Sequence, residues 1–305
     1  MSQEPRVASQ GSQEEEEEDF FGLNDLLPEP ESPLPPPFSF ASYAIPADIG
    51  LEVPDHRKSL ILRLVGSHPL WGHHLQVTAW NTARTLSTYL LKTPQITQSR
   101  HVLELGAGAG LPSIVCALAG SSKVVVTDYS DEGLLDNLRF NVDVNLEGEE
   151  KERIDVDGHV WGQSVDPLLD HLPKGQKYDL LILSDLVFNH SQHDALIKTV
   201  EATLASSPTQ LYDPSCPSAP LTEPSILVFF THHRPHLAHA DMAFFPRLAE
   251  SGNGWAYEKV VEEWAGAMFE DDPGDKRVRG TVHGWRAWRV RDGEEKGEKP
   301  SRVSL

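Results

Sequence analysis

Hydrophobic and polar positions follow two alternating patterns along the middle of the chain. Short apolar runs, typical of strands, are separated by stretches in which apolar residues recur at helical spacing. The apolar runs lie at 60–65, 101–105, 124–127, 154–160, 178–184, 226–231, 255–261 and 282–290. The helical stretches lie at 71–91, 114–119, 132–144, 193–204 and 237–248. Strands separated by helices predict a mainly parallel sheet in an α/β fold.

Both ends of the chain differ from this middle region. Residues 1–55 contain the acidic run 14–18 and a cluster of prolines at 33–37, a composition that predicts a disordered segment because it cannot bury a core. Residues 292–305 are rich in Gly, Glu and Lys and are predicted to form a polar tail. The sequence therefore predicts one folded domain over residues 56–291.

Charge and cysteine content narrow the class of protein. The formal net charge is −20, whereas a nucleic-acid-binding surface needs clustered Lys and Arg. This charge suits a basic partner, although solubility alone also explains it. Cys116 and Cys216 match no metal or redox spacing and favour a reducing compartment. No apolar run reaches the roughly 18–20 residues of a membrane span, and no secretory pattern begins the chain. We expect a cytoplasmic monomer with no nucleic-acid or membrane partner.

The sharpest chemical signal is a glycine turn. Residues 102–110 read Val-Leu-Glu-Leu-Gly-Ala-Gly-Ala-Gly, so a strand runs directly into glycines that open a helix. Glycine permits the tight turn and lets a ligand approach the backbone. A dinucleotide fingerprint requires Gly-x-Gly-x-x-Gly, but Leu111 stands at its last position. Glu104 would oppose a pyrophosphate and can accept hydrogen bonds from a cationic amino-acid ligand. These residues disfavour a dinucleotide oxidoreductase.

Asp128 is the second candidate for ligand binding. It directly follows the apolar run 124–127, and a carboxylate in this position accepts hydrogen bonds from both hydroxyls of a ribose. The alternative is that Asp128 caps the helix that follows. Given the glycine turn, we predict ribose binding.

Several segments, in order along the chain, resemble one enzyme family. The glycine turn resembles motif I of class I methyltransferases, and Asp185 and Phe188 match an Asp-x-x-Tyr or Asp-x-x-Phe motif of methyltransferase family 16, a family of lysine methyltransferases. The segments that carry this resemblance are 80–84, 104–110, 161–162 and 183–190. Within the family, the chain is most similar to the fungal methyltransferases of elongation factor 1-alpha, formerly described as nicotinamide N-methyltransferases. The segments typical of that group are 64–67, 69–73, 184–190 and 233–235.

The resemblance covers about residues 55–290 and implies both fold and chemistry. It implies a Rossmann-like seven-stranded sheet with helices on both faces, and S-adenosylmethionine as the cofactor. Besides Glu104, the cofactor-binding residues would be Trp80, Gly106, Ala107, Gly108, Asp128, Trp161 and Ser184. An insertion at 76–78 leaves open whether Trp71 or Trp80 contacts the cofactor, and core packing is the alternative for each tryptophan.

The resemblance also implies the acceptor. It would be the N-terminal glycine and adjacent lysine of elongation factor 1-alpha, and the alternative acceptor is nicotinamide. A non-catalytic binding module is disfavoured because the glycine turn is intact. Asp185 would hold the incoming amine and Phe188 would wall its channel, the alternative for Asp185 being a helix cap. Methyl transfer from a sulfonium needs no metal, and the histidines, His232 and His233 among them, show no metal-binding spacing. We predict that most of them are surface or satisfied core residues.

Overall fold

The structure is a computed structural model that describes most of the chain after residue 37. The described residues are 38–49, 54–65, 75–206, 223–252, 254–267, 273–290 and 295–301, with only the backbone of 75–80. They belong to one compact unit, Pro36–Leu305. The acidic run and the proline cluster lie outside the described residues.

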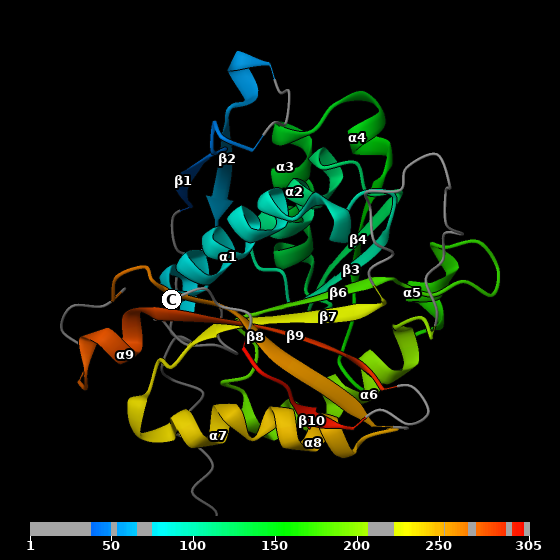
Figure 1. Ribbon diagram of the computed structural model, residues 1–305. Coiled ribbons are helices and arrows are strands. Elements are labelled where there is room, and N and C mark those ends of the chain that lie inside the picture. The colour runs from blue at the N-terminus through cyan, green and yellow to red at the C-terminus, as the bar shows by residue number, and fades with distance from the viewer. Residues whose placement is uncertain are drawn as a thin grey trace, which may run out of the picture. The chain divides into compact units, whose positions relative to one another are not determined.

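The elements follow the alternating pattern of the sequence (Figure 1). The strands are β1 (Ser39–Ala44), β2 (Ser59–Leu64), β3 (His101–Leu105), β4 (Lys123–Asp128), β5 (Ile154–Gly158), β6 (Leu180–Ser184), β7 (Ser225–Thr231), β8 (Trp255–Trp264), β9 (Thr281–Arg289) and β10 (Gly297–Glu298). The helices are α1 (Leu75–Lys92), α2 (Leu111–Leu118), α3 (Glu132–Asn145), α4 (Gly148–Glu152), α5 (Asp166–Asp170), α6 (His193–Thr203), α7 (Ala238–Met242), α8 (Phe244–Glu250) and α9 (Lys276–Gly280).

One sheet organises these elements, with the strand order β10-β8-β9-β7-β6-β3-β4-β5. Strands β3 to β7 pair in parallel, and β9 runs antiparallel to both of its main neighbours, β7 and β8. Helices α1, α2 and α3 cover one face, and α6, α7 and α8 lie on the other (Figure 1). The predicted seven-stranded α/β sheet with helices on both faces is confirmed, with the two-residue strand β10 added at one edge.

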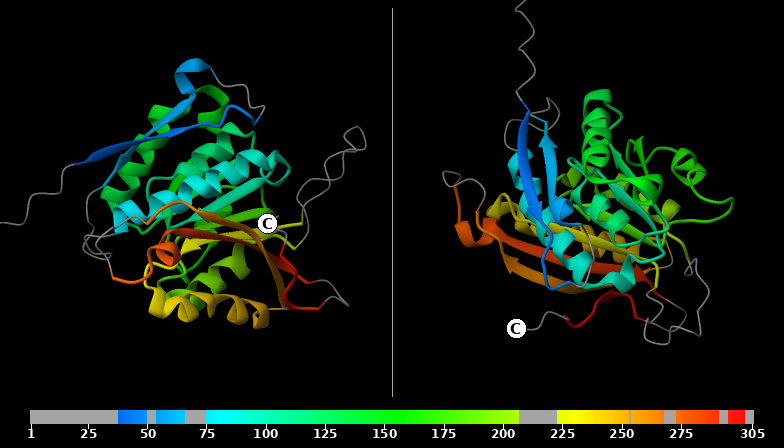
Figure 2. Two further views of the ribbon diagram at one scale, coloured as in Figure 1. Left: turned by 60° about the vertical axis from the view of Figure 1, so that its left-hand side comes forward. Right: turned by 90° about the horizontal axis from the view of Figure 1, so that it is seen from above.

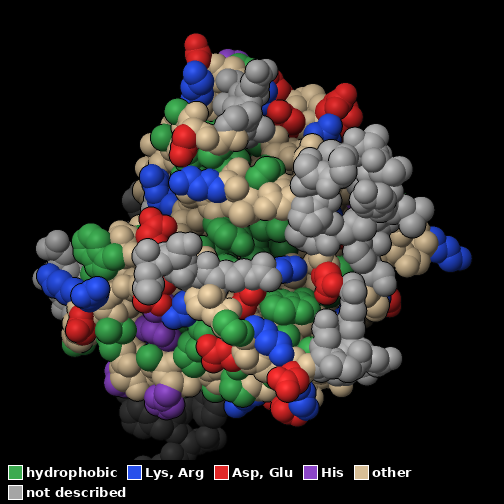
Figure 3. All heavy atoms as spheres, in the orientation of Figure 1, with side chains coloured by type: hydrophobic (Ala, Val, Ile, Leu, Met, Phe, Trp, Pro, Cys, Tyr) green, Lys and Arg blue, Asp and Glu red, His purple; other side chains and the backbone are tan. Residues whose placement is uncertain are grey.

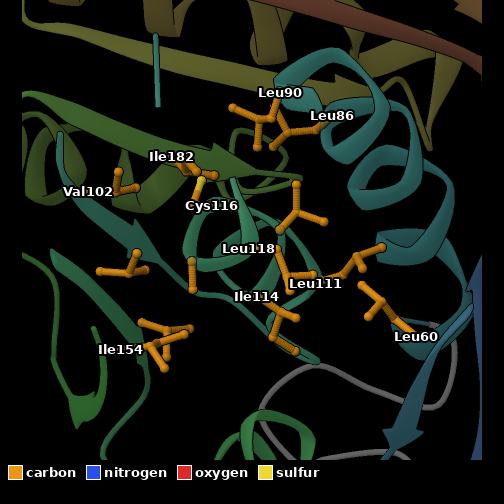
Figure 4. Close-up of a cluster of buried hydrophobic side chains, with 14 of the residues drawn as sticks. Leu60, Leu86, Leu90, Val102, Leu111, Ile114, Cys116, Leu118, Ile154 and Ile182 are labelled. Carbon is orange, nitrogen blue, oxygen red and sulfur yellow. The ribbon is translucent and has the colours of Figure 1, made fainter. Parts of the chain in front are cut away.

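The hydrophobic core has one layer on each face of the sheet, because side chains alternate along a strand. In β3, Val102 packs against α1, α2 and α3, whereas Leu103 and Leu105 pack with residues of α6 and α8. Figure 4 shows part of the first layer, in which Leu86 and Leu90 of α1 lie near the leucines of α2. Each fully buried leucine contributes roughly 2 kcal/mol to folding. These two layers fix the carboxyl ends of the parallel strands, where the glycine turn lies.

The first two strands form a separate two-stranded antiparallel sheet beside α1 and α3, and Figure 2 shows them side by side. A row of asparagines four residues apart on α3 completes the outer edge of β2. Asn145 and Asn141 accept hydrogen bonds from the backbone N–H groups of Ile61 (2.9 Å) and Arg63 (2.7 Å), and they donate to the same residues' carbonyls. These side-chain amides take the place of a third strand and satisfy backbone groups that would otherwise lack partners.

Several boundaries differ from the sequence-based prediction. The segment predicted to be disordered through residue 55 contains strand β1, whose Tyr43 is buried against the core. The predicted polar tail contains β10, which pairs with β8. The helix predicted at 237–248 is two helices, α7 and α8, separated at Ala243. Short elements such as β1 carry too few apolar residues to stand out from a polar, proline-rich surrounding.

Candidate active site

The glycine turn joins β3 to α2 with three glycines in the left-handed region. The φ values of Gly106, Gly108 and Gly110 are 61°, 58° and 75°. A Cβ on Gly106 would lie 2.7 Å from Cδ2 of Leu186 and 3.1 Å from Cζ2 of Trp161, whereas a Cβ on Gly108 would meet nothing within 4 Å. The turn is therefore packed closely at its first glycine and open at its second.

Asp128 ends β4 next to this open part of the turn. Its Oδ2 atom accepts the backbone N–H of Gly108 at 2.7 Å, and its Oδ1 atom accepts that of Tyr129 at 2.7 Å. The capping alternative is wrong, because Asp131 caps α3 by accepting from the backbone N–H of Leu134. The Asp128 carboxylate therefore lies beside the open part of the turn.

Glu104 is fully buried beneath the turn. One carboxylate oxygen accepts hydrogen bonds from the backbone N–H (3.0 Å) and the hydroxyl of Ser113 at the start of α2. The other oxygen, Oε1, has no hydrogen-bond partner among the described residues. Burial raises the pKa of this carboxyl to about 8, and the nearby Asp128 adds to the effect, although the Ser113 bonds oppose it. A cationic ligand group at this oxygen would compensate the cost of burial.

The structure brings most of the predicted cofactor-binding residues together. Ala107 donates its N–H to the Thr127 carbonyl at 2.9 Å, which holds the turn against β4, and the half-buried Trp161 ring lies against Gly106. Ser184 ends β6, the neighbour of β3, and its buried hydroxyl has no partner in the described part of the chain. Trp80 belongs to α1, but its side chain lies outside the described residues, as does all of Trp71.

The predicted acceptor residues lie at the same edge of the sheet, directly after β6. Asp185 adopts the left-handed backbone with φ 61°, which is uncommon for a residue other than glycine. Its two carboxylate oxygens each lie 2.9 Å from Nε2 of His233, and Oδ1 lies 3.4 Å from the backbone N–H of Thr231. Asp185 therefore does not cap a helix, and that alternative is wrong. The ring of Phe188 meets the His233 ring edge-on at 5.9 Å between centroids.

His233 is the residue that sequence reasoning missed. The segment 233–235 marked the family and His233 itself was expected to be a surface or satisfied core residue, since no spacing rule connects it to Asp185, 48 positions away. Pairing of β6 with β7 brings them together, because both lie just beyond the carboxyl ends of adjacent parallel strands. Burial alone would lower the pKa of His233, but the carboxylates of Asp185 and Asp241 together outweigh it, and the pKa is raised.

A second carboxylate, Asp241 of α7, joins the loops after β6 and β7. It lies 2.7 Å from Nε2 of His190 and 2.7 Å from Nδ1 of His232, and its side chain is almost fully buried. His283 of β9 lies beside His232 at 5.0 Å between ring centroids. Figure 3 shows histidine side chains gathered around the segment from β7 to α7. Within the described residues, no group of three or more His, Cys, Asp or Glu side chains has an arrangement that could hold a metal ion.

This fold and this turn define a class I, S-adenosylmethionine-dependent methyltransferase. The model of the lysine methyltransferase family matches residues 70–214. A protein N-terminal and lysine N-methyltransferase from Cryptococcus neoformans (strain JEC21) is 90% identical over 305 residues, covering 100% of both chains. The enzyme of the same name from Schizosaccharomyces pombe is 42% identical and covers 77% of this chain and 84% of its own length. Its counterpart from Candida glabrata is 40% identical, with 88% and 97% covered. The chain therefore belongs to this lysine methyltransferase family, as its motifs predicted.

The residues of the site fit S-adenosylmethionine. The unpartnered oxygen of Glu104 suits its amino group, and the open space at Gly108 beside Asp128 leaves room for a ligand at the turn. In the described part of the chain, none of the helices combines the length and apolarity that crossing a bilayer requires.

Proposed function

We propose that this methyltransferase modifies the α-amino group of the N-terminal glycine and the adjacent lysine of elongation factor 1-alpha, as a monomer in the cytoplasm. The observation that carries the proposal is the 90% identity, over the full chain, to a protein N-terminal and lysine N-methyltransferase. The particular acceptor rests on the resemblance of segments such as 184–190 and 233–235 to the fungal methyltransferases of that factor.

The cofactor side of the proposed site lies at the turn. S-adenosylmethionine supplies a methyl group that its sulfonium sulfur already activates. Asp128 would accept the ribose hydroxyls, and Glu104 would accept the amino group through its unpartnered oxygen. Trp161 would cover an aromatic or cationic part of the ligand. Gly106, Ala107 and Gly108 would contact S-adenosylmethionine through their backbone. Ser184 and Trp80 would contact the remaining sides of the ligand.

The acceptor side must supply a neutral amine. An α-amine has a pKa near ~7.7–8.0, so a useful fraction is neutral at cellular pH. A lysine has a pKa near ~10.4, so its pKa must fall by about 3 units, roughly 4 kcal/mol, before a useful fraction is neutral at cellular pH. Asp185 and His233 would form the polar rim of the acceptor channel, and Phe188 would exclude water. A net charge of −20 favours encounter with a basic acceptor.

The test is a direct comparison of acceptors. The purified protein is incubated with isotope-labelled cofactor and either elongation factor 1-alpha or nicotinamide, and the products are mapped by mass spectrometry. We expect label on the N-terminal glycine and the adjacent lysine. Label on nicotinamide with an unlabelled protein would replace this proposal with small-molecule methylation.

A further inference from the structure

The carboxylate of Asp185 lies behind a histidine. The exposed fraction of its side chain is 2%, whereas that of His233 is 20%. Both carboxylate oxygens lie at the same distance, 2.9 Å, from Nε2 of His233. An amine that approaches from solvent at this point therefore meets the imidazole before it meets the carboxylate.

The backbone holds this arrangement in place. Asp185 donates its N–H to the Phe229 carbonyl of β7 at 2.7 Å, so its main chain continues the β6–β7 pairing in a left-handed conformation. For a residue with a side chain this conformation costs of order 1–3 kcal/mol, and such strain is retained where the surroundings enforce it. Here the left-handed conformation directs the carboxylate toward Thr231, at the end of the neighbouring strand β7, and toward His233, just beyond that strand.

We propose that His233 is the catalytic base that receives the proton of the acceptor amine, and that Asp185 is a positioning residue that acts through it. This inference rests on the proposed function. The carboxylate accepts the Nε2–H of His233, so the lone pair of Nδ1 accepts a hydrogen bond from the Thr231 hydroxyl at 3.1 Å. The N–H bond of the substrate ammonium breaks, its electron pair stays on the amine nitrogen, and the proton forms a new bond at Nδ1 in place of the hydrogen bond that Nδ1 accepted from Thr231. The resulting imidazolium stays paired with Asp185.

The charged groups around His233 determine the pH at which it can act. Asp185 faces it from the end of β6 and Asp241 from α7, and both raise its pKa, whereas burial and the adjacent Arg234 lower it. The net direction is upward from the ordinary value of 6.5. Because a base must be unprotonated to accept a proton, the rate should fall as pH decreases through this raised pKa.

The first test is His233→Gln, with His236→Gln as the matched control on an exposed side chain three residues away. Two peptides serve as acceptors, one with a free N-terminal glycine and no lysine, and one that is blocked and carries a single lysine. We expect the His233 variant to lose roughly 100-fold or more in kcat for the lysine peptide at pH 7. The loss should be smaller for the α-amine and should shrink as pH rises, and S-adenosylmethionine affinity measured by calorimetry should stay within about twofold of the parent protein.

The second test is Asp185→Asn, which keeps the size of the side chain but removes its charge. In this variant the acid limb of kcat should shift to lower pH, because the anion that raises the His233 pKa is gone. The double variant should be no slower than His233→Gln alone, since Asp185 acts through His233. The inference is overturned if His233→Gln retains the parent kcat and pH profile, or if the two substitutions slow the reaction independently.

These outcomes are separable from a failure of the proposed function. If the parent protein methylates neither peptide nor elongation factor 1-alpha while it still binds the cofactor, the proposed acceptor is wrong. If the parent is active and the His233 variant matches it, only the assignment of the base fails. As a control, each variant should unfold at the same temperature as the parent protein, which ensures that only folded proteins are compared.

Discussion

Two buried carboxylates lie at the same edge of the sheet, one in β3 and the other directly after the neighbouring strand β6, and they meet different partners. Glu104 has only the neutral Ser113 as a hydrogen-bond partner among the described residues, and one of its oxygens has none. Asp185 already holds the imidazole of His233 through both of its oxygens. One Glu104 oxygen therefore lacks a hydrogen-bond partner among the described residues, whereas both oxygens of Asp185 meet an imidazole of the same chain.

This difference predicts two separable sets of variants. Changes beneath the glycine turn should alter S-adenosylmethionine affinity, and changes among the histidines should alter kcat with little effect on that affinity. A variant beneath the turn that changes only kcat, or a histidine variant that changes cofactor affinity, would show that the two sides are not separate.

The largest effect is expected at Gly106. Gly106 has a φ of 61°, which becomes strained once a side chain is present, and the Cβ of a Gly106→Ala variant would lie 2.7 Å from Leu186. We expect at least a 100-fold loss of cofactor affinity by calorimetry and a stability loss of about 1–3 kcal/mol. Gly108→Ala is the matched comparison, with similar φ and no neighbour within 4 Å. It should lose stability only through backbone strain, yet still lose affinity about tenfold or more if the ligand fills that space. Unchanged affinity in a folded Gly108→Ala protein would place the ligand elsewhere.

The next effect concerns Glu104. Glu104→Gln should weaken S-adenosylmethionine binding by about 1.5–3 kcal/mol, the value of a hydrogen bond to a charged group. Because burial raises the pKa of this carboxyl to about 8, the parent protein's affinity should rise as pH increases from 6 to 8 and the carboxylate forms. The Gln variant should lack this rise in a calorimetric pH series. An identical pH dependence in both proteins would mean that Glu104 does not meet the cofactor's amino group.

A smaller effect is expected at Asp241, on the acceptor side. Asp241→Asn removes the negative charge of a carboxylate that lies 2.7 Å from both His190 and His232, so the contact that joins the loops after β6 and β7 should weaken. We expect kcat to fall about tenfold and stability by about 1–3 kcal/mol, while cofactor affinity is retained. Asp194→Asn provides the control, since Asp194 forms an exposed ion pair with Arg247, which contributes little. A tenfold loss of cofactor affinity in the Asp241 variant would contradict the separation of the two sides.

The smallest effect is a pH dependence of stability at His283. Burial, aided by the neighbouring His232 and Lys259, lowers its pKa from 6.5 to about 4 in the folded protein. Below pH 6.5 the unfolded chain therefore binds a proton that the folded chain does not, so folding stability is lost as pH falls toward 4. Relative to pH 7, the loss at pH 5.5 should be about 1 kcal/mol. Denaturant titrations of the parent and of His283→Asn should differ by this slope, and parallel curves would show that His283 is accessible to protons when folded.

The order of strands and helices was predictable because buried parallel strands are short, continuous apolar runs. The turn at Gly106 and the acid at Asp128 were also predictable, since their positions follow from local sequence. The pairing of Asp185 with His233 was not, because it depends on which strands become neighbours. Strand β1 was not predicted either. The hydrogen bonds from the α3 asparagines to the edge of β2 were also not predictable, because polar residues at this spacing match an exposed helix face.

The most direct test of the whole account is mass spectrometry of elongation factor 1-alpha from cells with and without this protein. We predict methyl groups on the N-terminal glycine and the adjacent lysine in the first sample and unmodified residues in the second. Restoring the parent gene should restore the methyl groups, whereas restoring the Gly106→Ala variant should not. Equal methylation of both residues in the two samples would contradict the account.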